Sequence, residues 1–323
     1  MVKARAEAAG SRRWHVLSRL DEHQRRRLRV AVIVLLALAL AAWAVAPAVR
    51  AVTLVGNRHT RSAPDAHTAS LPVEEVHFTA TDGVHLAGWL AVAAHDAPTI
   101  ILVHGFKGSR TAMLPWARFL FAAGYNVLLY DSRGCGASAG WSIGLGATEP
   151  RDVIGAARYL AARSDLRVKQ FGALGVSLGA GEVLLAAARE PSLVTVVADS
   201  AWTDEHAQLD RMGSLPLGPL AVPALPYEPT LVDALIGAHL ADARPLNAIP
   251  HIAPRAVLLI ASADDANTTT PLAGTHQLYA AAGQPKDEWI APSGGHAGAL
   301  FAHPVEYKAR VLAFFSRYLE TKT

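Results

Sequence analysis

Cysteine is almost missing from this chain, since Cys135 is the single one among 323 residues. An internal disulfide is therefore excluded, and cysteine usage gives no information about the redox compartment. The sequence also lacks a His-Glu-x-x-His motif, a carboxylate cluster with ligand spacing, and a glycine-rich phosphate loop with its lysine. We therefore expect neither a metal site nor a bound cofactor.

An excess of basic charge is also missing from the main body of the chain. Of the 30 basic and 27 acidic residues, nine and three lie in residues 1–29, which leaves 21 basic and 24 acidic residues for the remainder. The formal net charge of +3 therefore reflects a basic N-terminal arm on a mildly acidic body. A nucleic-acid-binding function loses its support.

Directly after this arm, residues 30–49 form an apolar run of twenty residues without a charge. About 20 such residues are needed for a helix to cross a bilayer, so the run predicts a transmembrane anchor. A cleaved signal peptide and a buried core helix remain as alternatives. Because basic flanks face the cytoplasm, we expect 1–29 to be a cytoplasmic arm and the main body to lie on the opposite side of the membrane.

The rest of the chain divides into a polar linker at 50–70 and a globular domain at 71–323. In that domain, short apolar runs alternate with helical stretches. The predicted strands are 73–79, 84–92, 99–103, 126–130, 171–176, 193–198, 256–260 and one ending near 290, and the predicted helices are 112–123, 149–162, 178–188 and 304–318. This rhythm predicts an α/β fold with a mostly parallel sheet of about eight strands and helices on both faces.

The interval at about 202–252 interrupts the alternation, with prolines at 216, 219, 223, 226 and 229. Prolines this dense rule out one long helix, although 231–240 can form a short one. We interpret the interval as a small lid-like insertion, with a plain surface excursion as the alternative.

The pentapeptide Gly175-Val176-Ser177-Leu178-Gly179 joins a predicted strand to an alanine-rich helical run. A serine at a sharp strand-to-helix turn projects its hydroxyl clear of the sheet, and small residues two positions away let neighbouring backbone approach. The pair Asp264-Asp265 and then His296 follow later predicted strands. This order predicts a nucleophile at 177, an acid and a histidine, with His303 as the competitor of His296.

From residue 71 onward the chain resembles an α/β-hydrolase of the esterase and lipase-like group. The resemblance is carried by His104-Gly105-Phe106, by residues 130–138, by the pentapeptide at Ser177, by Asp265 and by Gly295-His296. It covers the chain except for the arm, the anchor and the linker. An anchored single domain with little cap is also similar to the membrane-tethered serine hydrolases of the Bem46 group.

The resemblance implies a catalytic triad of Ser177, His296 and Asp265. Its pattern places the acid three residues after a small residue at the strand end, which is Ser262 here instead of the usual glycine. Asp264 remains the alternative acid.

The resemblance also implies the remaining roles around the serine. The oxyanion hole consists of the backbone N–H groups of Phe106 and Leu178, and His104 braces the loop that carries Phe106. Asp131 and Arg133 are interpreted as residues that fix a neighbouring loop, with substrate contact as the alternative.

Together these expectations describe a membrane-anchored serine hydrolase that cleaves carboxylic esters, including lipid-like acyl esters, through an acyl-enzyme and without a cofactor. The nearby alternatives are a thioesterase and a single-domain serine peptidase. An alternative of another class is a membrane-tethered binding module that keeps the fold without using the triad.

Overall fold

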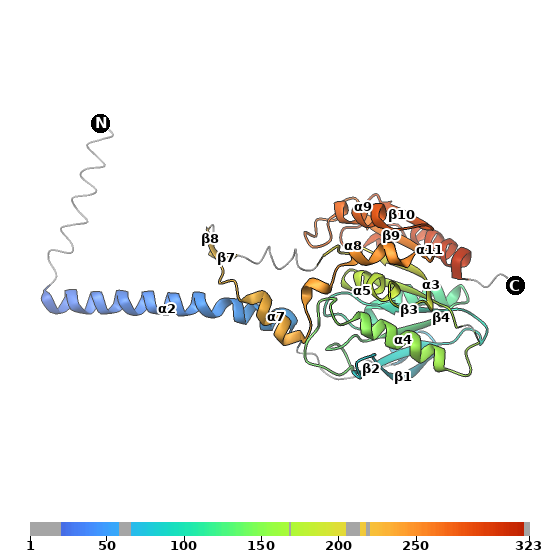
Figure 1. Ribbon diagram of the computed structural model, residues 1–323, viewed down its shortest axis with the longest axis horizontal. Helices are drawn as coiled ribbons and strands as arrows, with labels where there is room; N and C mark the ends of the chain where they lie inside the picture. Colours follow the sequence, from blue (N-terminus) through green and yellow to red (C-terminus); the bar gives the residue numbers. More distant parts are fainter. Residues whose placement is uncertain (1–20, 58–65, 168, 205–213, 218–219, 320–323) are drawn as a thin grey trace, which may run out of the picture.

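The computed structural model describes residues 21–57, 66–167, 169–204, 214–217 and 220–319. Eight strands form one sheet with the order β1-β2-β4-β3-β5-β6-β9-β10 (Figure 1). Their bounds are Val73–Thr79 (β1), His85–Ala91 (β2), Thr99–Val103 (β3), Asn126–Tyr130 (β4), Phe171–Val176 (β5), Leu193–Asp199 (β6), Ala256–Ser262 (β9) and Lys286–Ala291 (β10). β2 runs antiparallel to both neighbours, and all pairs from β4 to β10 are parallel. The predicted sheet is confirmed.

Helices cover both faces of this sheet. One face carries α4 (Pro150–Ala162), α5 (Leu178–Ala187), α8 (Pro245–Ala248) and α9 (Leu272–Ala281), and the other carries α3 (Leu114–Ala122), α10 (Ala299–Ala302) and α11 (Pro304–Leu319). In β3, Ile101 and Val103 pack into the first layer, while Ile100 and Leu102 pack into the second. Because both faces of the strand are buried, it is a continuous apolar run without polar alternation.

The first described helix, α2 (Glu22–Val55), has 34 residues and extends beyond the predicted span of 30–49 at both ends. At its start, Asp21 and Gln24 form a capping box, and the following residues favour helix. At its end, Ala51 and Val55 are fully buried against the globular domain. The first residues of the expected linker, 50–55, are helical in the structure, because apolar packing continues α2 to Val55.

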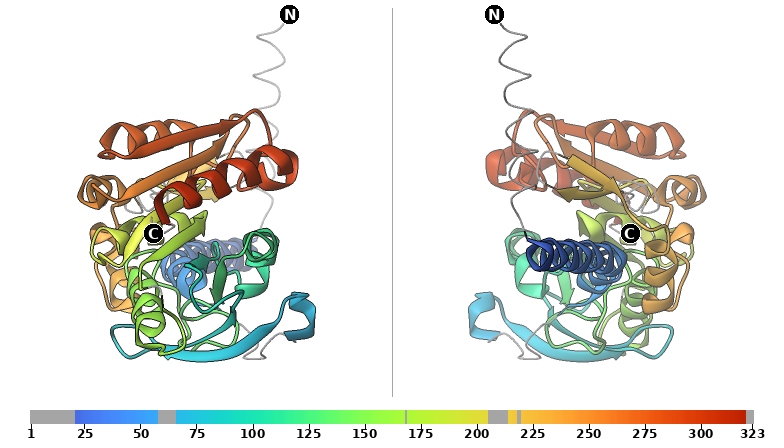
Figure 2. Two further views of the ribbon diagram at one scale, coloured as in Figure 1. Left: turned by 90° about the vertical axis from the view of Figure 1, so that its right-hand side faces the viewer. Right: turned by 90° about the vertical axis from the view of Figure 1, so that its left-hand side faces the viewer.

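Most of α2 projects away from the domain, and the right-hand view of Figure 2 looks along it. Only 6% of its most apolar window is buried, which does not fit a buried core helix. Within the described ranges, it is the one helix long and apolar enough to cross a bilayer.

The described parts of the interval 202–252 contain two short antiparallel strands, β7 (Ser214–Leu217) and β8 (Leu220–Pro223), followed by α7 (Glu228–Ile236) and α8. α7 begins and ends earlier than the helix predicted at 231–240. Pro229 suits the first turn of a helix, and Gly237 at φ 66° ends it in the left-handed conformation.

A third apolar cluster joins this interval to the end of α2 and to the domain. Its buried members are Ala51, Val55, Cys135, Ile143, Leu145, Leu178, Leu185, Trp202, Val232, Leu240 and Ala243. We call this set the junction cluster.

Candidate active site

Ser177 occupies the turn between β5 and α5 with φ 57° and ψ −118°, a conformation that costs a non-glycine residue about 1–3 kcal/mol. The two glycines of the pentapeptide explain how the turn is accommodated. A Cβ at Gly175 would lie 2.1 Å from the Gly179 carbonyl oxygen, and one at Gly179 would lie 2.5 Å from that of Val103. Neighbouring backbone occupies the space of a side chain, as the sequence predicts.

The first prediction concerns this close approach. In Gly179→Ala the new methyl group would collide with the backbone of β3, so we expect a loss of about 3 kcal/mol or more in unfolding free energy. Gly274→Ala in α9 is the control, because its Cβ first meets the Thr203 methyl group at 3.1 Å and alanine favours helix. Denaturant unfolding in detergent measures both variants. Equal stabilities would contradict the argument.

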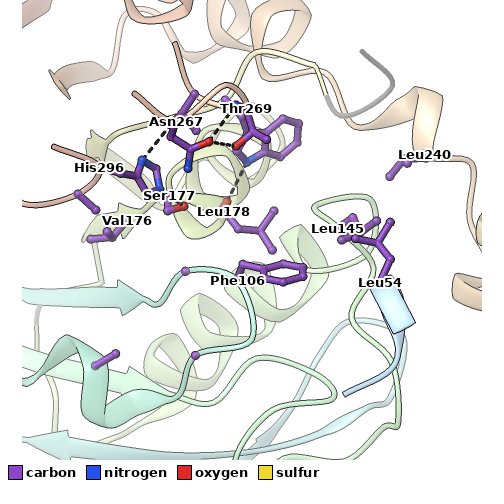
Figure 3. A pocket seen from close by; sticks show the side chains of 16 residues that line it. Leu54, Phe106, Leu145, Val176, Ser177, Leu178, Leu240, Asn267, Thr269 and His296 are labelled. Atoms are coloured by element: carbon purple, nitrogen blue, oxygen red, sulfur yellow. Dashed lines mark hydrogen bonds between the residues drawn. The ribbon is translucent and has the colours of Figure 1, made fainter. Parts of the chain in front are cut away.

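Three of the predicted side chains meet beyond the carboxyl ends of β5, β9 and β10. Ser177 Oγ lies 2.8 Å from His296 Nε2, and Asp265 Oδ2 lies 3.0 Å from His296 Nδ1. The Asp265 side chain is 1% exposed, whereas that of His296 is 28% exposed toward the cavity (Figure 3). The structure therefore brings together the serine, the histidine and one carboxylate of the expected triad.

The two neighbouring aspartates have different contacts. Asp264 Oδ1 accepts a hydrogen bond of 2.8 Å from the Gly295 N–H, which lowers the pKa of Asp264. Asp265 Oδ1 accepts one of 2.8 Å from the Asn267 N–H, which leaves Oδ2 facing His296. Asp264 therefore holds the loop before the histidine, and Asp265 contacts the imidazole itself.

The other histidines have other contacts. His303 Nε2 lies 3.1 Å from Ser293 Oγ. His104 is buried, and its Nε2 accepts a hydrogen bond from the Ser132 N–H at 3.1 Å, so Nδ1 carries the proton that reaches the Gly105 carbonyl. Burial lowers the pKa of His104, which favours this neutral form. His104 braces the loop before Phe106.

The buried acids near this loop form ion pairs. Asp131 accepts hydrogen bonds from the guanidinium group and the N–H of Arg110. Arg133 bridges Asp152 and Asp82, as a residue that fixes a loop would do. These ion pairs agree with the expectation that Asp131 and Arg133 fix a loop.

The residues expected to provide the oxyanion hole border the serine. Leu178 is the first residue of α5, so its N–H has no partner within the helix and lies at the positive end of the helix dipole. A Cβ at Gly105 would lie 3.2 Å from Ser177 Cβ, which places the Gly105-Phe106 loop against the serine. Phe106 and Leu178 both line the cavity.

Sequence reasoning missed Thr270. Its Oγ1 lies 3.0 Å from His296 Nδ1 and 3.5 Å from Asp265 Oδ2. The available signal was the run Asn267-Thr268-Thr269-Thr270 just after the acid, which is rich in side-chain oxygens.

Asp199, the last residue of β6, was also missed. Its Oδ2 accepts a hydrogen bond of 2.9 Å from the Tyr307 hydroxyl, and its Oδ1 accepts one of 3.1 Å from Ser200 Oγ. Ser200 Oγ in turn accepts one of 3.1 Å from the N–H of Ala297. Burial raises the pKa of Asp199 to about 6 despite these donors. This chain of contacts supports the residue next to His296.

The second prediction follows from that raised pKa. Folding disfavours the charged form of Asp199, so this group lowers stability as the pH rises from about 4 to about 6. Asp199→Asn removes the titration and keeps an oxygen for Tyr307. We expect the unfolding free energy of the variant, relative to the parent, to rise by up to about 3 kcal/mol across this window. Chemical denaturation at about pH 4.5 and about pH 7 measures the unfolding free energy of both proteins. A decrease for the variant relative to the parent would contradict the prediction.

A cavity of about 620 Å³ lies over these groups. Its apolar lining includes Leu54, Phe106, Leu145, Val176, Leu178, Trp202 and Leu240, and its polar lining includes Ser177, Asn267, Thr269, Thr270 and His296. Across the described residues, no group of three or more His, Cys, Asp or Glu side chains is placed to hold a metal ion.

The eight-stranded sheet and the serine turn at the end of β5 show the α/β-hydrolase fold. A family model described as X-Pro dipeptidyl-peptidase (S15 family) matches residues 56–228, which include Ser177. The chain belongs to this family.

Individual relatives match most of the chain. YqkD of Bacillus subtilis is 31% identical over 230 residues, which cover 69% of this chain and 73% of YqkD. YfhR of Salmonella typhi is 27% identical over 266 residues, or 77% of this chain and 83% of YfhR.

Among solved structures, the esterase Pf2001 of Pyrococcus furiosus superposes with a TM-score of 0.66 and 23% identity, over 83% of this chain and 99% of Pf2001. At this identity the likeness shows the fold.

Proposed function

We propose that this protein is a membrane-anchored serine hydrolase that cleaves carboxylic esters through an acyl-enzyme. The observation that carries the proposal is the continuous contact from Ser177 Oγ through His296 to Asp265, at a sharp turn facing an apolar cavity. A serine hydroxyl needs a base to take its proton, and the base needs a carboxylate to orient it.

The geometry supports the following steps. Ser177 Oγ attacks the ester carbonyl carbon while His296 Nε2 takes its proton, and Asp265 stabilises the imidazolium that forms. The N–H groups of Phe106 and Leu178 stabilise the oxyanion. His296 then donates the proton to the departing alcohol, and a water molecule activated by His296 releases the acid from Ser177.

The position of the protein in the membrane is part of the proposal. The uncharged residues 30–49 within α2 span the bilayer, and the basic arm at 1–29 stays in the cytoplasm, so the hydrolase domain lies on the opposite side. A retained anchor is favoured over a cleaved signal because α2 continues without interruption into the domain at Val55.

The family description favours a second candidate, a serine peptidase that releases dipeptides. Such an enzyme has to bind the ammonium group of a free N-terminus, which calls for a strong acceptor. Among the described residues lining the cavity none is acidic, and most are apolar, which favours an ester with an apolar acyl part. Assays of a nitrophenyl ester, an acyl thioester and an X-Pro nitroanilide in parallel separate the candidates.

The third prediction tests the activated serine. A fluorophosphonate probe is expected to label the parent chain in its membrane fraction, to fail with Ser177→Ala and to label His296→Ala far more slowly. Gel fluorescence measures the labelling, and Gly274→Ala serves as an unaffected control. A folded parent that the probe never labels would support the non-catalytic binding module instead.

The fourth prediction separates the two aspartates. Asp265→Asn is expected to lower kcat/KM by about 10²–10⁴-fold, because the amide no longer stabilises the imidazolium or enforces its tautomer. Asp264→Asn keeps an oxygen for the Gly295 N–H, so we expect a change below about tenfold. Steady-state kinetics on a soluble ester measures both variants. The reverse order would assign the acid to Asp264.

A further inference from the structure

The end of α2 forms part of the candidate active site. Leu54 of α2 lines the same cavity as Ser177 and His296. In Figure 3, Leu54 and Leu145 lie next to each other, and Leu240 lies apart from them on the same side of the view, away from Ser177 and His296. The helix proposed as the anchor therefore supplies one wall of the pocket.

Several contacts fix this wall in place. Ala51 and Val55 belong to the junction cluster together with Leu178, the residue after the serine. Lys107 Nζ donates a hydrogen bond of 2.7 Å to the Thr53 carbonyl oxygen. The last turn of α2 is thus held to the cluster that contains Leu178 and to the residue after Phe106.

An ion pair adds to this attachment. Arg50 and Glu228 are 3.1 Å apart, and they join α2 to the start of α7. The helix and the interval that carries Leu240 are therefore held together on the same side of the cavity.

The same interval also contacts α2 within the apolar run of 30–49. Trp43 Nε1 donates a hydrogen bond of 2.8 Å to the Pro223 carbonyl oxygen. The Tyr227 hydroxyl donates to the Ala44 carbonyl oxygen and accepts from the Ala48 N–H at 3.2 Å. Residues 212–227 contain no charged side chain, which suits a segment at a membrane boundary.

The length of the helix places the pocket relative to the bilayer. Leu54 lies five residues beyond Val49, the last residue of the apolar run, which is about 7.5 Å along the helix axis. The head-group layer on each side of the hydrocarbon core is about 5–8 Å thick. The wall formed by Leu54 is therefore at the outer edge of the head-group layer, next to the leaflet from which α2 emerges.

We propose that the substrate is a long-chain acyl ester that resides in the leaflet from which α2 emerges, and that Leu54 is a specificity-determining residue. The inference rests on the proposed serine hydrolase activity. The acyl chain lies along Leu54, Leu145 and Leu240, and its carbonyl carbon reaches Ser177. Attack by Ser177 breaks the ester bond and releases the alcohol, and water then releases the fatty acid.

The first test compares Leu54→Trp with Val52→Trp in the full chain reconstituted into phosphatidylcholine vesicles. The indole at 54 occupies space for the chain, whereas Val52 is 47% exposed outside the cavity lining. For Leu54→Trp we expect kcat/KM to fall about tenfold or more on membrane-embedded methylumbelliferyl palmitate and less than about twofold on the acetate. Val52→Trp should change neither value.

The inference would be overturned if kcat/KM of Leu54→Trp fell equally on both esters, or did not fall on the palmitate. Labelling of the parent and of Leu54→Trp by the fluorophosphonate probe keeps this outcome separate from failure of the proposed function. If the proposed function fails, the parent will show neither labelling nor hydrolysis of any ester.

The second test asks where the substrate comes from. With palmitate probe in the same vesicles as the protein, the rate should follow the mole fraction of probe in the bilayer and should fall when unlabelled phospholipid dilutes it. The same amount of probe in separate vesicles should react far more slowly. A rate that follows the bulk concentration in both arrangements would contradict delivery from the leaflet.

Discussion

The close approach of backbone segments around Ser177 is the constraint on which the rest of the site depends. Gly175 and Gly179 leave no room for side chains, so β3, β5 and the start of α5 meet directly. Ser177 is held at a positive φ that the surrounding buried strands stabilise. Because the sheet fixes this turn, it fixes the direction of the hydroxyl, and every other group has to be brought to it.

The histidine is brought to the serine by contacts from two other strands. Asp264, after β9, holds the N–H of Gly295, and Ser200, after β6, holds the N–H of Ala297. These anchors flank His296 on both sides along the chain. The carboxyl ends of parallel strands meet at one edge of the sheet, so short loops from several strands can share this task.

The end of α2 belongs to the hydrolase domain as much as to the proposed anchor. Its last turns pack with Leu178 and Val232 in the junction cluster and supply Leu54 to the cavity. The orientation of the domain at a membrane would then follow from a continuous helix and not from a flexible connection. The same residues at the end of α2 would then serve both substrate access and anchoring.

The sequence by itself determined the strands of the main sheet, the order of their elements and the turn at Ser177, because these follow from apolar runs covered on both sides and from glycines at exact positions. It presented Asp264 and Asp265 as a pair, and only the turn after β9 decided which carboxylate faces His296. Tertiary structure likewise decided the roles of Thr270 and Asp199 and the helical conformation at the end of α2. Their roles come from contacts between segments far apart in the chain, which local residue preferences do not record.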